Sequence, residues 1–183
     1  MGKRLTKIYT RTGDDGTTGL GDGSRLAKDS ARIESIGAVD TLNSHIGRVL
    51  AHELPDDVRE VLTDVQHDLF DLGAELCLPG VTKIGEDHLA ALERELDRFN
   101  ATLPPLKEFI LPGGAPASAD AHLARTACRS AERIVVALGK AEPVGDGARR
   151  YLNRLSDLLF VLARVINRAA GRPDVLWQPG RKP

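Results

Sequence analysis

Aromatic residues and cysteines are both scarce in this 183-residue chain. Phe, Trp and Tyr together make up 4% of the sequence, whereas Leu, Ala and Arg are abundant. That composition argues against a β-sandwich and favours packed helices. Two cysteines, Cys77 and Cys128, are too few for a disulfide framework, and we expect both to be reduced, partly buried thiols.

Net charge and long apolar runs are lacking as well. The 25 basic residues nearly balance 26 acidic ones, which leaves a formal net charge of −1. No global field therefore attracts nucleic acid or an anionic membrane, and any phosphate site must come from a local cluster of cations. No apolar run is long enough to span a bilayer, and MGKRLTKIY lacks the apolar core of a signal peptide. We expect a soluble cytoplasmic protein with no membrane or nucleic-acid partner.

The stretch YTRTGDDGTTGLGDG (residues 9–23) is rich in glycine but contains no Walker A pattern. Glycine allows positive φ and close approach to a ligand, whereas Asp and Thr side chains stabilise tight turns. Successive amides in such a loop can form an anion-binding nest, and Lys28 and Arg32 add charge just after it. From composition alone, the stretch is either a mobile tether or a phosphate cradle.

Hydrophobic periodicity predicts five amphipathic helices and no convincing strand. The first helix begins near Asp29 or Ser30, either of which could cap it. The helices are expected at residues 29–52, 55–78, 86–101, 117–140 and 148–170. They indicate an all-α, up-and-down five-helix bundle in a single domain, 1–183. The domain has an extended glycine-rich N-terminal segment (1–27), the helical bundle (28–171) and a C-terminal tail (172–183).

The fourth predicted helix carries a basic ridge. Arg125, Arg129 and Arg133 follow one another at four-residue spacing, so each is turned by about 40° from the last. The ridge lies roughly opposite an apolar stripe made of Leu123, Ala127, Ala131, Ile134, Val135 and Leu138. It is either a solvated face with Glu–Arg pairing or a phosphate clamp, because guanidinium groups hold phosphate oxygens bidentately.

Polar residues also interrupt two apolar faces. On the first helix, Asp40 and Asn43 lie inside or beside the apolar arc. Burying an unpaired carboxylate is costly, so Asp40 needs a cation, and an arginine of the ridge is the natural candidate. On the last helix, Asn153, Asp157 and Arg164 form a polar edge beside a leucine stripe. An asparagine in such a place is more often a surface residue than a ligand contact.

Asp64 and His67 form a D-x-x-H pair on the second helix. This pair leaves a ferritin-like di-metal bundle as an alternative function. Such a centre needs a second motif of the same kind, and the remaining histidines are scattered along the sequence.

Several segments taken together resemble the PduO-type ATP:cob(I)alamin adenosyltransferases. They are TRTGDDGTTGLGDG with the following K-x-x-x-R and G-x-V-D-x-L-N-S, then FILPGG, then ARTACRSAER and YLNRLSD. They span nearly the whole chain in the right order. The resemblance implies a five-helix bundle assembled as a homotrimer, with active sites between subunits. It also implies transfer of the 5′-deoxyadenosyl group of ATP to the cobalt of cob(I)alamin, with release of triphosphate.

Matched residue by residue, the resemblance implies which residues bind ATP. The N-terminal segment would wrap the phosphates, and the fourth and fifth helices would complete the site. The matching positions are Thr10, Arg11, Thr12, Gly13, Thr18, Gly19, Lys28, Arg129, Ser130, Ala131, Glu132, Arg133 and Asn153. Mg²⁺ would arrive on ATP rather than in a fixed protein cage. It would share with Lys28, Arg129 and Arg133 the stabilisation of the departing triphosphate.

The resemblance also implies three catalytic residues. Arg125 looks like the family's essential arginine, which pairs with an aspartate of the adjacent subunit, here Asp40. Phe109 looks like the family's aromatic wedge beneath the corrin ring, which would keep axial ligands off cobalt. Its alternative is a core plug beside Ile110 and Leu111. Because Co(I) itself attacks the 5′ carbon, no side chain need act as nucleophile, and the protein catalyses by positioning.

Two departures from the family pattern and one functional alternative stay open. The family often has Glu where this chain has Thr41, and often a second Arg where it has Ser130. Loss of one charge beside the phosphates could weaken ATP binding. The expected partners are a flavoprotein reductant and an adenosylcobalamin-dependent enzyme. The alternative is a protein that binds ATP and adenosylcobalamin and delivers the product without turnover.

Overall fold

The computed structural model describes residues 8–181, and it confirms the five-helix bundle. Each predicted helix is present, with ends within a few residues of those expected. The helices are α1 (Ala31–Leu50), α2 (Asp56–Cys77), α3 (Glu86–Asn100), α4 (Pro116–Leu138) and α5 (Asp146–Ala169). Ser30 is the N-cap of α1, since its hydroxyl accepts from the N–H of Ile33.

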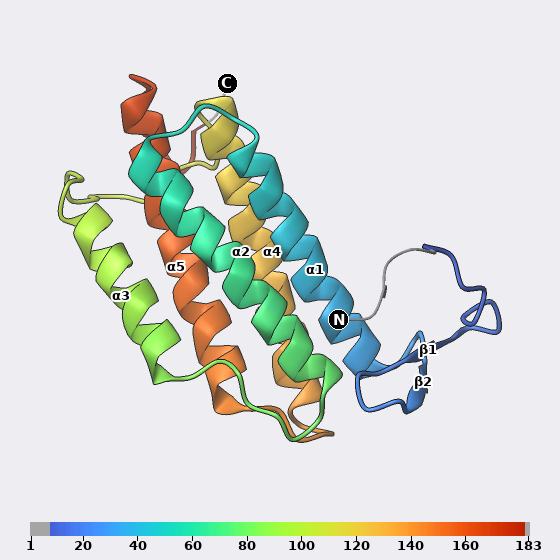
Figure 1. The fold of residues 1–183 in the computed structure, drawn as a ribbon. Coiled ribbons are helices and arrows are strands. Elements are labelled where there is room, and N and C mark those ends of the chain that lie inside the picture. Colours follow the sequence, from blue (N-terminus) through green and yellow to red (C-terminus); the bar gives the residue numbers. More distant parts are fainter. Residues whose placement is uncertain (1–7, 182–183) are drawn as a thin grey trace.

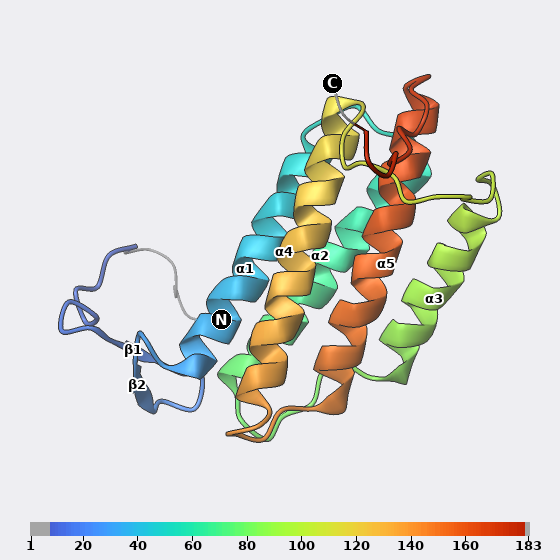
Figure 2. The same cartoon turned by 180° about the vertical axis from the view of Figure 1, so that it is seen from behind.

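Successive helices run in opposite directions along the bundle (Figures 1 and 2). Helix α4 packs against both α1 and α5, α1 also packs against α2, and α3 packs against α5. This arrangement leaves α3 on one side of the molecule and α1 on the other, next to the N-terminal segment (Figure 1). None of the helices within residues 8–181 is long and apolar enough to cross a membrane.

Leucines of α5 and small residues of α4 fill much of the core. The leucine stripe of α5 is buried as predicted, and it includes Leu152, Leu155, Leu158, Leu159 and Leu162. The stripe predicted for α4 was wrong at Leu123, whose side chain is 46% exposed. Small residues occupy the buried face of α4 because this helix packs closely between α1 and α5. They are Ala117, Ala121, Ala124, Cys128 and Ala131.

The N-terminal segment before α1 contains two strands that the sequence did not predict. Strands β1 (Thr17–Gly19) and β2 (Arg25–Ala27) pair antiparallel, with Thr18 opposite Leu26. Asp22 accepts hydrogen bonds from the amide and hydroxyl of Ser24, and Gly23 adopts φ +88° in the turn between them. Each strand has three residues, which is too few for an alternating pattern to stand out.

The C-terminal tail returns to the bundle and pairs with the loop before α4. The N–H of Leu111 donates to the carbonyl of Val175 over 2.8 Å, and Ile110 forms an isolated β-bridge with Leu176. Arg164 anchors this return. It was predicted to lie on a polar edge, yet it is only 4% exposed, because its Nε binds Asp174 at 2.8 Å and its Nη2 donates to the carbonyl of Pro104.

Candidate active site

In the described part of the N-terminal segment, taken here with the adjoining Lys28 as residues 8–28, two cationic side chains bind the main chain. Lys28 donates from Nζ to the carbonyl of Gly13 over 2.8 Å and from its main-chain N–H to the carbonyl of Gly16. Arg25 reaches the carbonyl of Thr12 and the hydroxyl of Thr17. Sequence reasoning did not single out Arg25. Arg25 pairs with Gly19 across the hairpin, and its side chain reaches Thr17 only because of this strand pairing, which the sequence did not predict.

Turn geometry in this segment favours a shaped loop over a slack tether. Arg11 adopts φ +60° and Gly16 φ +84°, which orient successive peptide groups as a tight loop requires. Asp15 accepts from both the hydroxyl and the amide of Thr17, and these hydrogen bonds hold the pKa of Asp15 below its ordinary value. The carboxylate is thus engaged in stabilising the turn.

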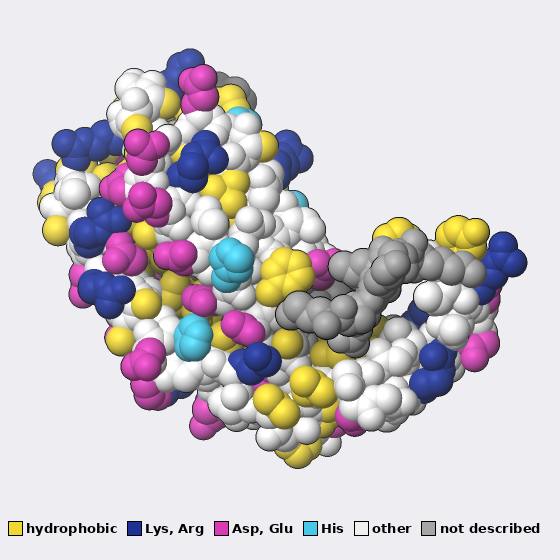
Figure 3. Space-filling view, viewed as in Figure 1, with side chains coloured by type: hydrophobic (Ala, Val, Ile, Leu, Met, Phe, Trp, Pro, Cys, Tyr) yellow, Lys and Arg dark blue, Asp and Glu magenta, His cyan; other side chains and the backbone are white. Residues whose placement is uncertain are grey.

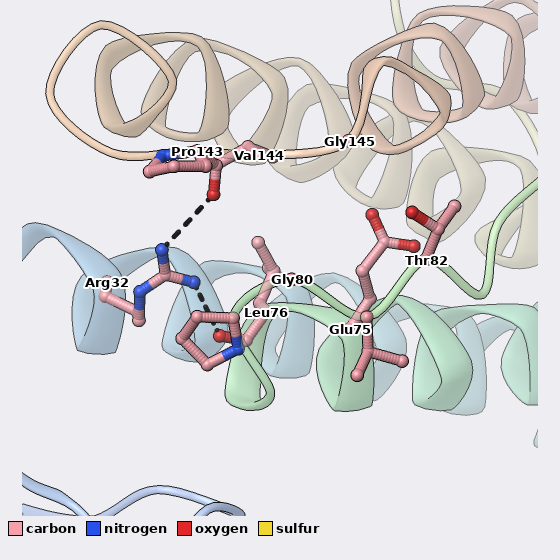
Figure 4. A pocket seen from close by; sticks show the side chains of 10 residues that line it. Arg32, Glu75, Leu76, Gly80, Thr82, Pro143, Val144 and Gly145 are labelled. Atoms are coloured by element: carbon pink, nitrogen blue, oxygen red, sulfur yellow. Dashed lines mark hydrogen bonds between the residues drawn. The ribbon is translucent and has the colours of Figure 1, made fainter.

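The sequence predicted that Arg32 would add positive charge beside the N-terminal segment, and this prediction was wrong. It is 2% exposed and points from α1 into a cavity of about 250 Å³ at the end of the bundle (Figure 4). There Nε binds Glu142 at 2.7 Å, Nη1 donates to the carbonyl of Leu76 over 2.8 Å, and Nη2 donates to the carbonyl of Pro143. The buried guanidinium therefore joins α1, the end of α2 and the loop before α5.

The basic ridge of α4 presents unpaired cations. Arg129 and Arg133 are exposed, and within residues 8–181 neither forms an ion pair. Glu132, which could have neutralised the ridge, instead accepts from Nδ2 of Asn153 over 3.0 Å. Arg154 holds Asn153 from the other side, because its Nη1 donates to the amide oxygen of Asn153 over 2.6 Å. The ridge is therefore exposed, as a solvated face predicts, but the Glu–Arg pairing expected with it is not present among residues 8–181.

Arg125 lies deeper than its two neighbours on the ridge. Its Nε donates to Nδ1 of His122 over 3.4 Å. Burial lowers the pKa of Arg125, and the charge of Arg129 lowers it further. Sequence reasoning had counted His122 only among the scattered histidines, although it lies one helical turn before Arg125.

The sequence placed Asp40 inside or beside the apolar arc of the first helix. In the single chain, however, Asp40 is exposed. It lines a groove of about 480 Å³ between α1 and α2, together with Ile36, Leu69 and Phe70. Phe70 is 73% exposed, and Figure 3 shows hydrophobic side chains at the surface over these two helices. In the part of the chain that the structure describes, Asp40 has no ion-pair partner.

Asn43, the other polar residue on this face, is buried. Its side-chain amide donates to the carbonyl of Gln66 over 3.3 Å, and the amide of Gln66 donates in return to the carbonyl of Asn43. This reciprocal pair joins α1 to α2 beside the groove. Asn43 thus helps to join the two helices, although its buried Oδ1 has no hydrogen-bond partner among residues 8–181, whereas Asp40 is exposed.

Phe109 is 76% exposed, so the alternative of a core plug was wrong. Its ring meets the ring of Trp177 edge to face, with centroids 6.4 Å apart. The two glycines that follow in FILPGG shape the loop: Gly114 adopts φ +103°, and a Cβ there would lie 2.1 Å from the amide oxygen of Asn167. Asn167 in turn accepts from the N–H of Ala115 and donates to the carbonyl of Gly113.

The two groups of predicted ATP ligands do not meet within one chain. The N-terminal segment projects from the beginning of α1, away from the bundle (Figures 1 and 2). It contacts the bundle where the N–H of Gly21 donates to the carbonyl of Cys77. No hydrogen bond or ion pair between described residues links it to Arg129 or Arg133. Residues 8–181 also contain no group of three or more His, Cys, Asp or Glu side chains that could hold a metal ion.

Comparison with known proteins identifies the family of this fold. A family model described as cobalamin adenosyltransferase matches residues 8–166. The chain is 61% identical to a cobalamin adenosyltransferase of Cupriavidus metallidurans over the full length of both proteins. It is 49% identical to a corrinoid adenosyltransferase of Mycobacterium tuberculosis, a match that covers 98% of this chain and 97% of the relative.

Solved structures agree with these relatives. A variant PduO-type ATP:corrinoid adenosyltransferase from Lactobacillus reuteri, complexed with cobalamin and ATP, is 33% identical. It superposes with a TM-score of 0.89 and covers 94% of this chain and 99% of its own. A second variant of that enzyme, complexed with ATP, is 34% identical with a TM-score of 0.88. The chain described above therefore belongs to the cobalamin adenosyltransferase family, and within it to the PduO-type corrinoid adenosyltransferases.

Proposed function

We propose that this protein transfers the 5′-deoxyadenosyl group of ATP to the cobalt of cob(I)alamin and releases triphosphate. The observation that carries the proposal is the match to a PduO-type enzyme complexed with cobalamin and ATP, at a TM-score of 0.89. Relatives that match nearly the whole chain carry the same activity in their names. The di-metal alternative built on Asp64 and His67 has no comparable support.

The reaction exchanges one bond for another. The lone pair of Co(I) forms the bond to the 5′ carbon of ATP, while the bond from that carbon to the triphosphate oxygen breaks. Its electron pair leaves with triphosphate, so cobalt is formally oxidised by two electrons. The protein has to align the two reactants and stabilise negative charge on the leaving group. Neither task requires a side-chain nucleophile.

The leaving group would be held between the N-terminal segment and the ridge of α4. The proposed ligands in the N-terminal segment are Thr10, Arg11, Thr12, Gly13, Thr18, Gly19 and Lys28. Arg129 and Arg133 would hold the phosphates from α4, with Ser130 and Ala131 beside them and with Glu132 and Asn153 as a fixed hydrogen-bonded pair. The absence of ion pairs on Arg129 and Arg133 within residues 8–181 supports this use, because their positive charge is not already neutralised.

The site would be completed between protomers of a homotrimer. Arg125 is half-buried without an anionic partner among residues 8–181, and Asp40 is exposed in an apolar groove. Arg125 therefore needs an anionic partner, and the carboxylate of Asp40 can provide one. Contact between Arg125 of one protomer and Asp40 of the next would also bring the N-terminal segment of one chain near the ridge of another. The N-terminal segment and the ridge of α4 do not contact each other within one chain, and this separation supports such an assembly.

Phe109 would act on the lower face of the corrin ring. Cob(II)alamin is easier to reduce once its lower axial ligand has been removed, and a bulky apolar side chain can exclude both water and the cofactor's own base. The exposed ring of Phe109 is available for such a contact. We further propose that Mg²⁺ arrives with ATP, that a flavoprotein supplies the electron in the cytoplasm, and that an adenosylcobalamin-dependent enzyme receives the product.

A spectral assay tests the proposed function. Protein, ATP, Mg²⁺ and chemically reduced cobalamin are mixed, and the absorption bands of adenosylcobalamin are followed together with triphosphate release. Formation of both products in equal amounts is expected. Binding of ATP and adenosylcobalamin without turnover would instead support the delivery role, and metal found in the purified protein would revive the di-metal alternative.

A further inference from the structure

Two buried polar atoms, one on His122 and one on a residue whose charge acts on His122, have no hydrogen-bond partner among residues 8–181. One is Nε2 of His122 on α4, and the other is Oδ1 of Asp174 in the C-terminal tail. His122 is 3% exposed, so its unpaired nitrogen lies away from bulk water. A buried polar atom left without a partner is costly, and two such atoms in one neighbourhood call for a common explanation.

The contacts of Asp174 show which kind of partner its unpaired Oδ1 requires. Oδ2 accepts from Nε of Arg164 over 2.8 Å, and Arg164 is itself fixed by the carbonyl of Pro104. An ionised carboxylate can only accept hydrogen bonds, so Oδ1 requires a donor. His122 is the buried neighbour whose imidazole is close enough for the charge of Asp174 to raise its pKa. The ring of Phe160, edge-on to that imidazole at 6.3 Å, limits how it can turn.

Arg125 determines which nitrogen of His122 carries the proton. A guanidinium has donors only, and Nε of Arg125 points at Nδ1 of His122 over 3.4 Å. Nδ1 must therefore act as an acceptor, which in neutral imidazole places the hydrogen on Nε2. Nε2–H is then a donor, and Oδ1 of Asp174 is the acceptor it lacks. The two unpaired atoms are complementary.

We infer that His122 is a positioning residue for Arg125. The neutral imidazole accepts from the guanidinium at Nδ1, and Asp174 of the C-terminal tail fixes that tautomer by accepting from Nε2–H, either directly or through one water molecule. Arg125 is thereby held in the orientation that it needs to meet Asp40 of the adjacent protomer, an assignment that rests on the proposed function. Asp174, which belongs to the tail, thus acts on a side chain of α4.

The charges around His122 favour this neutral state. Burial lowers the pKa of His122, Arg125 lowers it further, and Asp174 opposes both effects. The other charged groups packed around this network are Arg129 on α4 and Arg164 on α5. Protonation would put an N–H on Nδ1, facing the N–H of Arg125, and would add a like charge. The guanidinium would be pushed out of place as the pH falls below the pKa of His122.

Tautomer and activity give separate tests. Nitrogen NMR of the imidazole rings in the intact protein at neutral pH should show His122 as the Nε2–H tautomer, and Asp174→Asn should convert it to a mixture.

His122→Leu should lower kcat/KM roughly 10- to 100-fold, as for a misplaced catalytic group, with little change in KM for ATP. His122→Asn keeps an oxygen near the position of Nδ1, so it should recover part of the loss and abolish the decline in kcat/KM at acid pH. His67→Leu, at an exposed histidine of α2, is the matched control.

The outcomes separate this inference from the proposed function. An Nδ1–H tautomer or an imidazolium at neutral pH would overturn the inference, as would normal kcat/KM in a folded His122→Leu variant. Circular dichroism checks the fold of each variant, and His122→Asn serves if the leucine variant does not fold. If the wild-type protein makes no adenosylcobalamin, the proposed function fails. The NMR result then still decides whether Asp174 fixes the tautomer of His122.

Discussion

The main-chain N–H of Trp177 donates to the carbonyl oxygen of Phe109 over 2.7 Å, and the two rings meet edge to face. The tail after α5 and the loop before α4 are therefore one structural unit, although they are far apart in the sequence. This unit leaves Phe109 exposed while its main chain is fixed. An exposed aromatic ring on an anchored main chain is what the proposed wedge beneath the corrin requires.

Phe109→Ala should therefore affect reduction more than alkyl transfer. The variant should lose most of its turnover, roughly 100-fold, when cob(II)alamin and a reductant are supplied, because the lower face of cobalt is no longer protected. It should lose far less with chemically prepared cob(I)alamin. Both rates are measured by the appearance of adenosylcobalamin. Leu111→Ala, at another exposed apolar residue of the loop, is the control, and equal losses of Phe109→Ala in the two assays would refute the wedge role.

Arg125→Ala should abolish the contact proposed between protomers. We expect turnover to fall by roughly 100-fold, because a cation near the leaving group is lost and Asp40 of the neighbour is left unpaired. Asp40→Ala should behave similarly. The exchange Arg125→Asp with Asp40→Arg should recover part of the trimer, as measured by light scattering. Arg149→Ala removes an exposed arginine from α5 and serves as the control. Normal turnover in Arg125→Ala would show that the pairing is wrong.

Gly13 is a position where one methyl group would disturb the N-terminal segment. A Cβ on Gly13 would lie 2.9 Å from the carbonyl oxygen of Thr17 and 3.2 Å from Nζ of Lys28. Gly13→Ala should therefore displace Lys28 from the carbonyl it binds and raise KM for ATP by about tenfold, with the stability of the bundle unchanged. Gly85→Ala, where a Cβ would meet no atom within 4 Å, is the matched control. An unchanged KM would argue against phosphate binding here.

The bundle could be predicted from the sequence because each helix carries a long periodic stripe. Leu152 to Leu162 on α5 illustrate this, since a helix that buries so many leucines in register has few alternatives. The α4 register was harder, because alanines and Cys128 face the core while Leu123 faces outward. Small residues give a weak periodic signal. The paired strands were missed because three residues each are too few to show alternation. The returning tail depends on a contact distant in sequence, between Ile110 and Leu176, which no local pattern contains.

The candidate site was predictable only as a set of residue types. The spacing of Arg125, Arg129 and Arg133 and the glycines around Gly13 could be read directly from the sequence. Their relation could not, because no contact between described residues joins them within one chain, and the contact that we propose lies between protomers. His122 was missed for a similar reason: its significance comes from Asp174, which approaches it only through the fold of the tail.

Asp120 predicts how stability changes with pH. Its carboxylate is buried on α4 and binds His52 at 2.8 Å and Arg48 at 3.0 Å. The hydrogen bond from His52 lowers the pKa of Asp120 below its ordinary value of 3.8, burial opposes this, and Arg48 adds to it. Because the pKa is lower in the folded state, the stabilisation is fully present above the unfolded pKa. It is lost as the pH falls through the folded value.

Asp120→Asn should remove that acid dependence. We expect the free energy of unfolding at neutral pH to fall by about 1–3 kcal/mol, because hydrogen bonds to a charged, buried group are lost. Urea denaturation at a series of pH values measures both effects. Asp157→Asn, at an exposed carboxylate of α5, is the control. A variant whose stability declines in acid as steeply as that of the wild type would show that Asp120 is not the responsible group.

The two cysteines should differ sharply in reactivity. Cys128 is fully buried between α4 and α5, its thiol donates to the carbonyl of Leu152, and burial raises its pKa far above the ordinary value. Only the thiolate attacks disulfide reagents, so Cys128 should react no faster than the protein opens. Cys77 is partly exposed at the end of α2 and should react promptly. Titration with an aromatic disulfide should thus give one fast thiol, which Cys77→Ser removes, and two fast thiols would contradict the packing of α4 against α5.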